Sequence, residues 1–428
     1  MSTLGMPRER VFADENIRLG TSVGRGLSGG LLVIGLAGVV TTVIAGLVLG
    51  VGAARVVLHA LHTGFVISIG LSLGGLVWTM ILQAMNAGWA IVARRQFENL
   101  MSLMWVGLVM LVGIVILQAV YVNTLWDPAS EEAQYGPFLW RWMNPVYVDG
   151  DVLYDHKLPF LNVPFFIIRQ VLYAAVWLAL AGVMWGLSRG QDEDGDRWRS
   201  AKAGRVACVG LLLYAFTTAF ASFDWVMGLD FHWFSTMFGV YYFAGNALAA
   251  VAICILTLLI LRGTGKLAGA FTEEHLHDLG KLLFAFTVFW AYISFSQYFL
   301  IWYANIPEEA QFFAARREPG TIWHPLSIAI PLGHFIIPFL VLLPRPARRS
   351  GVVIGAVCVW LLVFHVIDLF WMIRPEAGAD GLSWIDPIAI GGMLAIFVGL
   401  FIRKVGDGPL IPLRDPRERD LLGHKNYV

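Results

Sequence analysis

Ten long apolar runs constrain this 428-residue chain more than any other feature of its sequence. A helix of about 20 apolar residues crosses the hydrocarbon core of a bilayer with all its backbone polar groups paired internally. Only 14% of the residues are charged, against roughly 25% in soluble domains. The sequence therefore predicts an all-α polytopic membrane protein. The predicted spans cover approximately residues 27–51, 57–85, 99–122, 163–187, 205–227, 234–261, 278–303, 323–343, 351–373 and 384–403.

The distribution of positive charge predicts the orientation of these spans. Of the 30 Lys and Arg residues, about 22 fall in the N-terminal segment, the C-terminal tail and the connections on that same side. Short loops rich in Lys and Arg stay in the cytoplasm, so both termini are predicted to be cytoplasmic. The predicted parts are an N-terminal segment (1–26), a membrane domain (27–403) and a C-terminal tail (404–428). The first span lacks a cleavage motif and is expected to be retained.

The two long connections on the other side, residues 123–162 and 304–322, are expected to be docking surfaces for extramembrane partners. Their Trp and Tyr residues favour anchoring at the membrane surface over a binding site. Net charge is zero, which gives no basic field for nucleic acid. The three cysteines lie in apolar runs without a CxxC motif, so iron–sulfur, c-type haem and zinc sites built on cysteine are excluded. No metal ligand set is expected in this chain.

Ionisable side chains within the spans are the candidate functional groups, because a charge in hydrocarbon costs at least about 2.5 kcal/mol. An outer set lies in the half of the spans away from the termini: Arg169, Asp224, His232, His365 and Asp368. His365 and Asp368 are three residues apart, so they share a helix face and are expected to hydrogen-bond or share a proton. An inner set lies near the termini: Glu98, His277, Asp278 and Lys281.

Other polar residues in the spans are explained by packing, solvation or helix capping. His334 has no obvious partner and is interpreted as a packing residue, and b-type haem is not expected because no facing histidine pairs share one depth. His59 and His62 are placed near the membrane surface, where solvent could satisfy them. Thr272 is expected to cap the helix that contains His277, and Lys281 could extend to the cytoplasmic surface.

Several strings are long enough to carry a family resemblance. They are DWVMGLDFHWFSTMFGVYYFAG from Asp224, DLGKLLFAFTVFWAYISFSQYFLIWYANIPEE from Asp278, AGWAIVARRQFE from Ala87, NVPFFIIRQVLY from Asn162 and HVIDLFWMIRP from His365. Over most of residues 55–375 the chain resembles the F-type membrane subunit of bacterial alternative complex III, within the NrfD/PsrC-like group of quinone subunits. The resemblance implies two four-helix bundles, formed by spans 2–5 and 6–9 and flanked by spans 1 and 10.

This resemblance also implies a function and partners. The complex oxidises menaquinol or ubiquinol in the bacterial inner membrane and passes electrons to cytochrome c or to a terminal oxidase. Iron–sulfur clusters and c-type haems would lie on partner subunits beside a C-type membrane homologue, and this chain would bind no cofactor itself. Its contribution would be quinol binding, proton conduction or both, with no catalytic activity expected from the isolated chain.

Quinol oxidation releases two protons, so the ionisable residues are predicted to accept and conduct protons. Asp224, His232, His365 and Asp368 are predicted to line one outward polar cavity, with Arg169 holding a carboxylate ionised. The inner set would take protons from the cytoplasm. A hydroxyl and amide relay would connect the two: Tyr242, Tyr292, Ser294, Ser296 and Gln297.

Three alternatives remain open from the sequence. The chain could be a structural scaffold whose buried charges neutralise one another. It could be the quinone subunit of a molybdopterin-type reductase. A secondary transporter is a third class, although no glycine- or proline-broken spans occur at corresponding places in two halves.

Overall fold

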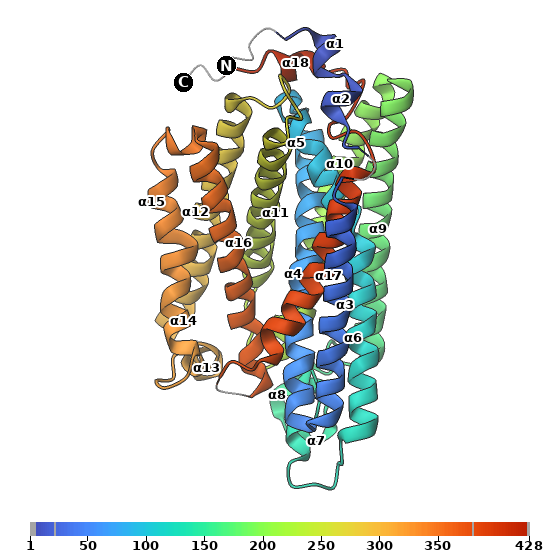
Figure 1. Ribbon diagram of the computed structural model, residues 1–428. Coiled ribbons are helices and arrows are strands. Elements are labelled where there is room, and N and C mark those ends of the chain that lie inside the picture. The colour runs from blue at the N-terminus through green and yellow to red at the C-terminus, as the bar shows by residue number, and fades with distance from the viewer. Residues whose placement is uncertain (1–5, 21–22, 379–380, 426–428) are drawn as a thin grey trace.

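The chain folds almost entirely into helices in a computed structural model that describes residues 6–20, 23–378 and 381–425 (Figure 1). Within these residues, ten segments are long and apolar enough to cross a membrane, as the sequence predicts. They are α3 (Arg25–Val48), α4 (Val51–Ala84), α5 (Ile91–Met101) with α6 (Met104–Leu125), α9 (Val163–Asp194), α10 (Arg197–Trp225), α11 (Phe238–Gly263), α12 (Glu273–Ala304), α14 (Trp323–Ile330) with α15 (Ile337–Leu342), α16 (Gly351–Ile373) and α17 (Ile385–Gly406). The described residues form no β-strand, only a single bridge between Arg18 and Pro409.

The spans form two bundles of four. In the first bundle α4 packs against α5, α6 and α10, and α9 packs against α10. In the second bundle α11 packs against α12 and α16. The α14–α15 segment packs against α12 and α16 and completes the bundle. Helix α4 lies at the centre, because it contacts α11, α10 and α17 and is buried almost throughout. This is the bundle arrangement that the family resemblance implies.

The first and last spans, α3 and α17, lie side by side against α4 (Figure 1). A Cβ on Gly35 would lie only 2.7 Å from the carbonyl oxygen of Gly392. Small residues at this crossing therefore let the two backbones approach closely, as membrane helices commonly do. The two flanking spans thus form a pair on one side of the bundles.

Both termini lie at the same end of the molecule, which we call the terminal end (Figure 1). It carries α1 (Arg8–Val11), α2 (Asp14–Ile17) and α18 (Glu418–Leu422). The opposite, distal end carries α7 (Pro145–Val148), α8 (Val152–Lys157) and α13 (Pro307–Ala315). The two long connections of the sequence, 123–162 and 304–322, therefore fold at one end, away from both termini.

Two local features position the second bundle. Thr272 caps α12 together with His275 in a reciprocal capping box, which confirms the predicted cap. In the eighth span, a π-helical segment from Pro331 to Ile336 separates α14 from α15. Pro331 has no amide hydrogen to donate within the helix, which favours a local change of helical repeat.

Candidate functional site

A cavity of about 550 Å³ lies in the distal half of the second bundle. Its walls come from α12, from the α14–π segment and from α16, with Tyr241 of α11 and Arg317 after α13 completing it. Most of the lining is aromatic or aliphatic, with few polar groups, as in sites for apolar small molecules. Four residues of the predicted sites line it: Tyr292, Ser294, Gln297 and Asp368.

Asp368 is the acidic group of this cavity. Its side chain is 2% exposed, and its Oδ1 accepts a hydrogen bond from the Tyr241 hydroxyl. Among the described residues, no Lys, Arg or His forms an ion pair with Asp368, whereas most other buried carboxylates here have such a partner. A buried carboxyl without a cationic partner can accept or release a proton in contact with a bound molecule.

The cavity reaches the surface of the bundle at membrane depth. Tyr292 and Phe295 line it from α12, and each is 64% exposed. Tyr298 and Arg317 lie toward the distal end, where the guanidinium of Arg317 is 4.6 Å from the centre of the Tyr298 ring. An apolar molecule could therefore enter sideways from lipid and meet a cation at the distal end of the cavity.

The predicted hydrogen bond between His365 and Asp368 is wrong. Both ring nitrogens of His365 lack a hydrogen-bond partner among the described residues, and Asp368 binds Tyr241 instead. His365 faces His334, with 6.3 Å between the ring centres. The two residues share a helix face, as predicted, but they lie one turn apart and so meet different neighbours.

His334 is a buried packing residue, as interpreted from the sequence, and it lies against the cavity wall. Its ring centre is 4.0 Å from that of Trp290, which lines the cavity. Both ring nitrogens of His334 also lack a protein partner among the described residues. The His334–His365 pair therefore places two imidazoles without hydrogen-bond partners among the described residues behind the cavity.

Arg169 pairs with a carboxylate, as predicted; this carboxylate is that of Asp224, and the pair lies in the first bundle. Nε and Nη2 of Arg169 donate to the two oxygens of Asp224 at 2.9 and 2.6 Å. Gln170 and Tyr173 donate to the same carboxylate at 3.2 and 3.0 Å. The carboxylate is therefore held by four hydrogen bonds from α9 and does not line the cavity of Asp368.

His232 occupies a third location, in the turn before α11. Its Nε2 is 2.7 Å from Oδ2 of Asp151, and its Nδ1 is 3.6 Å from Oδ1 of Asp230. The adjacent carboxylates of Asp230 and Asp151 raise the pKa of His232 above its usual value. The residues predicted to share one outward cavity thus lie in three separate places, because sequence gives depth but not position around the helix axis.

The inner set also divides between the bundles. Glu98 of α5 binds Arg94 and Arg95, each at 3.1 Å, and accepts a hydrogen bond from Ser188 at 2.8 Å. Arg94 continues this network to Asp415 of the C-terminal tail at 2.7 Å. Glu98 therefore belongs to a set of ion pairs that ties the tail to the first bundle.

The other inner residues lie at the start of α12. Asp278 is 2.8 Å from the amine of Lys281 and 2.5 Å from Nε2 of His424. His277 is buried, and neither of its ring nitrogens has a partner among the described residues. The Lys281 side chain is 46% exposed, as expected for a lysine that extends to the surface.

The predicted relay is only partly assembled. Tyr292, Ser294 and Gln297 line the cavity, and Gln297 accepts a hydrogen bond from Ser235 at 3.0 Å. Tyr242 faces the first bundle and donates to the carbonyl of Val66 at 3.0 Å. Ser296 does not line the cavity. The relay residues therefore divide between the cavity and the bundle interface.

His59 and His62 do not lie where solvent reaches them, because α4 is the central helix. Both side chains are fully buried. His62 Nε2 lies 2.6 Å from the carbonyl oxygen of Trp225, and His59 Nδ1 lies 2.8 Å from that of Arg55. The predicted surface position is wrong, because depth along a span does not determine whether a side chain faces solvent or a neighbouring helix.

Two residues of the site did not stand out in the sequence: Tyr241 and Arg317. Helix α11 is apolar on nearly every side, so its pattern does not show that Tyr241 faces α16 while Tyr242 faces α4. Around His334, Pro331, Gly333 and Pro338 are the local signals of an irregular helix. Arg317 has no sequence signal beyond its positive charge in the 304–322 connection.

Comparisons with known proteins add no further identification. A scan of models of protein families finds no match to the chain. A search of curated proteins likewise finds no relative.

Proposed function

We propose that the chain is the membrane subunit of a respiratory quinol oxidoreductase of the alternative complex III type, and that the cavity beside Asp368 binds the quinol. The observation that carries this proposal is the cavity itself: an apolar space that opens toward lipid and ends on a buried carboxyl. A hydrophobic quinol requires lateral entry, apolar walls and a nearby proton acceptor.

Quinol oxidation yields a quinone, two protons and two electrons. In the proposed site, Asp368 accepts the protons of the two hydroxyls one after the other, giving up the first before it takes the second, while Tyr241 holds its carboxyl in place. The side chains of Gln297 and Arg317 can hydrogen-bond the oxygen atoms of the ring. The imidazoles of His334 and His365 would carry each proton onward.

The electrons must leave through groups that other subunits hold. In the proposed complex these are iron–sulfur clusters and c-type haems on partners docked at the distal end. The C-type homologue would lie in the membrane, and cytochrome c or a terminal oxidase would be the acceptor. The proposal places both termini in the cytoplasm of a bacterium, so that protons are released on the distal side.

A scaffold role is the second candidate, because the ion pairs of the first bundle support it. Arg169 with Asp224 and Glu98 with Arg94 are neutralised within this bundle. Such buried pairs need no proton-linked role to explain them. The two candidates therefore divide the molecule: the first bundle provides structure, and the second binds quinol.

A photoreactive azidoquinone tests the proposal on the intact complex in native membranes. Irradiation is expected to label peptides of α12 and of the α14–α16 region, and excess unlabelled quinol should prevent this. Labelling confined to other subunits would favour the scaffold. The purified complex should also show c-type haem absorption bands, whereas a molybdopterin without c-type haem would indicate a reductase instead.

A further inference from the structure

Arg316 lies behind the wall of the Asp368 cavity, where α13, α14 and α16 meet. It is the residue directly after α13, and its side chain is only 1% exposed. A guanidinium keeps its charge when it is buried, so its N–H groups need acceptors within the protein. The acceptors of Arg316 therefore show what this buried charge does.

The side chain of Arg316 joins α13 to the last turn of α16. Its Nε donates to the carbonyl oxygen of Trp371 at 3.2 Å, and its Nη2 donates to that of Met372 at 2.8 Å. The last four carbonyls of a helix have no donor within the helix, and α16 ends at Ile373. Nη2 also donates to the carboxylate of Glu376 at 3.0 Å, which balances the charge. Arg316 therefore caps the distal end of α16.

A second connection runs from Trp371 back to Arg316. Nε1 of Trp371 donates to Oγ of Ser327 at 2.9 Å, and this Oγ lies 2.8 Å from the main-chain carbonyl oxygen of Arg316. Together with the hydrogen bond from Nε of Arg316, these contacts close a ring of three residues. Trp371 is thus held through both its main chain and its indole.

Aromatic packing also fixes Arg316. The guanidinium carbon lies 3.4 Å from the centre of the Phe312 ring, over which the charge is favourably placed. Phe312 in turn stacks on Trp233, with 3.9 Å between the ring centres and 11° between the ring planes. Nη1 of Arg316 donates to the carbonyl oxygen of Phe312 at 2.9 Å. The guanidinium is therefore held in one orientation by a ring and by fixed acceptors.

The residues that Arg316 holds belong to the cavity. Three of them line it: Ser327, Trp371 and Met372. Asp368 also lines the cavity, three residues before Trp371, so the two side chains face it from one side of α16. Arg316 therefore fixes the wall of the cavity next to its acidic group.

We infer, on the basis of the proposed function, that Arg316 is a positioning residue for quinol and acts through Trp371. A wall that is already ordered costs no binding free energy to arrange when the quinol ring arrives. The carboxyl of Asp368 is held separately, by the Tyr241 hydroxyl. Loss of the Arg316 contacts should therefore weaken quinol binding while proton transfer to Asp368 continues.

The test measures kcat and KM for quinol oxidation by the intact purified complex. Arg316→Lys keeps a charge beside Glu376 but loses the fork that reaches Trp371 and Met372. KM is expected to rise about tenfold, with kcat within about twofold of wild type, because only binding to the wall is lost. Haem content and subunit ratio should stay unchanged.

Ser327→Ala opens the ring of three residues at its other contact. It is expected to raise KM about threefold, the effect of one neutral hydrogen bond. Both substitutions release Trp371, so the double variant should show about the tenfold rise of Arg316→Lys alone and not the roughly thirtyfold product of independent effects. A role limited to stability would lower the melting temperature and leave KM unchanged.

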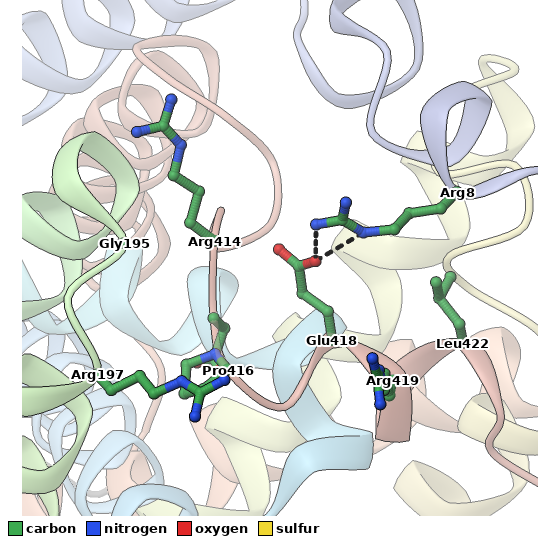
Figure 2. A pocket seen from close by; sticks show the side chains of 9 residues that line it. Arg8, Gly195, Arg197, Arg414, Pro416, Glu418, Arg419 and Leu422 are labelled. Atoms are coloured by element: carbon green, nitrogen blue, oxygen red, sulfur yellow. Dashed lines mark hydrogen bonds and ion pairs between the residues drawn. The ribbon is translucent and has the colours of Figure 1, made fainter.

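Two arginines elsewhere provide matched controls. Arg94 is 2% exposed and binds two carboxylates. Arg8 donates two hydrogen bonds to Glu418 at the terminal end, as the dashed lines in Figure 2 show. Arg94→Lys and Arg8→Lys lose the same fork as Arg316→Lys and should leave the KM for quinol within about twofold of wild type.

A KM within about twofold of wild type in both Arg316→Lys and Ser327→Ala would overturn the inference. Azidoquinone labelling of the cavity would then leave the proposed function in place. A roughly thirtyfold rise in the double variant, or an equal rise in the controls, would also overturn the inference, since the effect would not pass through Trp371. If Arg316→Lys does not assemble, Ser327→Ala decides alone. If the wild-type cavity is not labelled, the proposed function fails, and the inference with it.

Discussion

The Tyr241 hydroxyl donates a hydrogen bond to Oδ1 of Asp368, joining α11 to α16 at the wall of the distal cavity. This contact differs from the charge pairs of the first bundle, because its donor is neutral. The carboxyl is therefore held in position without a counter-ion among the described residues. A proton acceptor for a membrane-soluble substrate needs this combination of fixed geometry and unneutralised charge.

Replacing Asp368 with Asn should remove proton acceptance while keeping the shape of the side chain. Quinol oxidation by the complex is expected to fall about 100-fold or more, because general-base catalysis typically contributes 10²–10⁴-fold. Quinol-driven proton release from reconstituted vesicles would fall with it. The complex should assemble normally, as judged by its haem content and subunit ratio.

Asp127→Asn is the matched control, because Asp127 is an exposed carboxylate in a distal turn. Its activity should equal that of the wild type. Unchanged proton stoichiometry in the Asp368 variant would exclude Asp368 as the acceptor. Failure of that variant alone to assemble would assign Asp368 a structural role.

Filling the cavity tests substrate binding separately from proton transfer. Ala291 lines the cavity on α12, and Ala291→Trp would occupy space that the ring or tail of quinol needs. The KM for quinol is expected to rise about tenfold, because steric overlap costs roughly 1–3 kcal/mol. Ala249→Ser, a small change on the buried face of α11, is the control for general disturbance of the bundle. An unchanged KM with a folded protein would place quinol elsewhere.

Much of the fold follows from the sequence because span length is a local property. Each of the ten apolar runs corresponds to a helix, since hydrocarbon admits no lipid-exposed backbone without internal hydrogen bonds. A carboxylate partner for Arg169 was also predictable, because an ionised group at that depth needs one, although only the structure identifies it as Asp224. The direction that each side chain faces around the helix axis does not follow from the sequence, as α11 shows. Tyr241 and Tyr242 are adjacent in an apolar helix, and only packing decides which of them meets Asp368.

The ion pair between Arg169 and Asp224 should support stability and not quinol binding. Arg169→Lys keeps the charge but loses the two parallel hydrogen bonds, which measure 2.9 and 2.6 Å. We expect a loss of about 2 kcal/mol in the free energy of unfolding, within the range for buried charged hydrogen bonds. The quinol KM should stay within twofold of wild type. A rise in KM without loss of stability would indicate that this pair takes part in quinol binding.

The attachment of the C-terminal tail to the first bundle should depend on Asp415. Burial by itself would raise the pKa of Asp415, but hydrogen bonds from Arg417 and the charge of Arg94 lower it below the usual range. Asp415→Asn leaves Arg94 buried with a weaker partner, so a loss of about 3 kcal/mol in stability is expected. Limited proteolysis should then cut the tail faster. Asp407→Asn is the control, because Asp407 makes no ion pair in the described part of the chain.

His232 should make the stability of the distal end depend on pH. Hydrogen bonding to Asp230 and the contact with Asp151 raise its pKa above 6.5, so its protonated form stabilises the fold. A raised pKa in the folded state means that this contribution is complete below about pH 6.5 and is lost as the pH rises through the folded-state value. The difference in melting temperature between wild type and His232→Gln should be about 2 °C at pH 6 and vanish above pH 8.5, since a partly exposed pair contributes little. His156→Gln, an exposed histidine in α8 without an ion pair in the described structure, should show no such pH dependence. A difference that persists at pH 8.5 would mean that shape or neutral hydrogen bonding, and not the charge of His232, holds the 151 and 230 segments together.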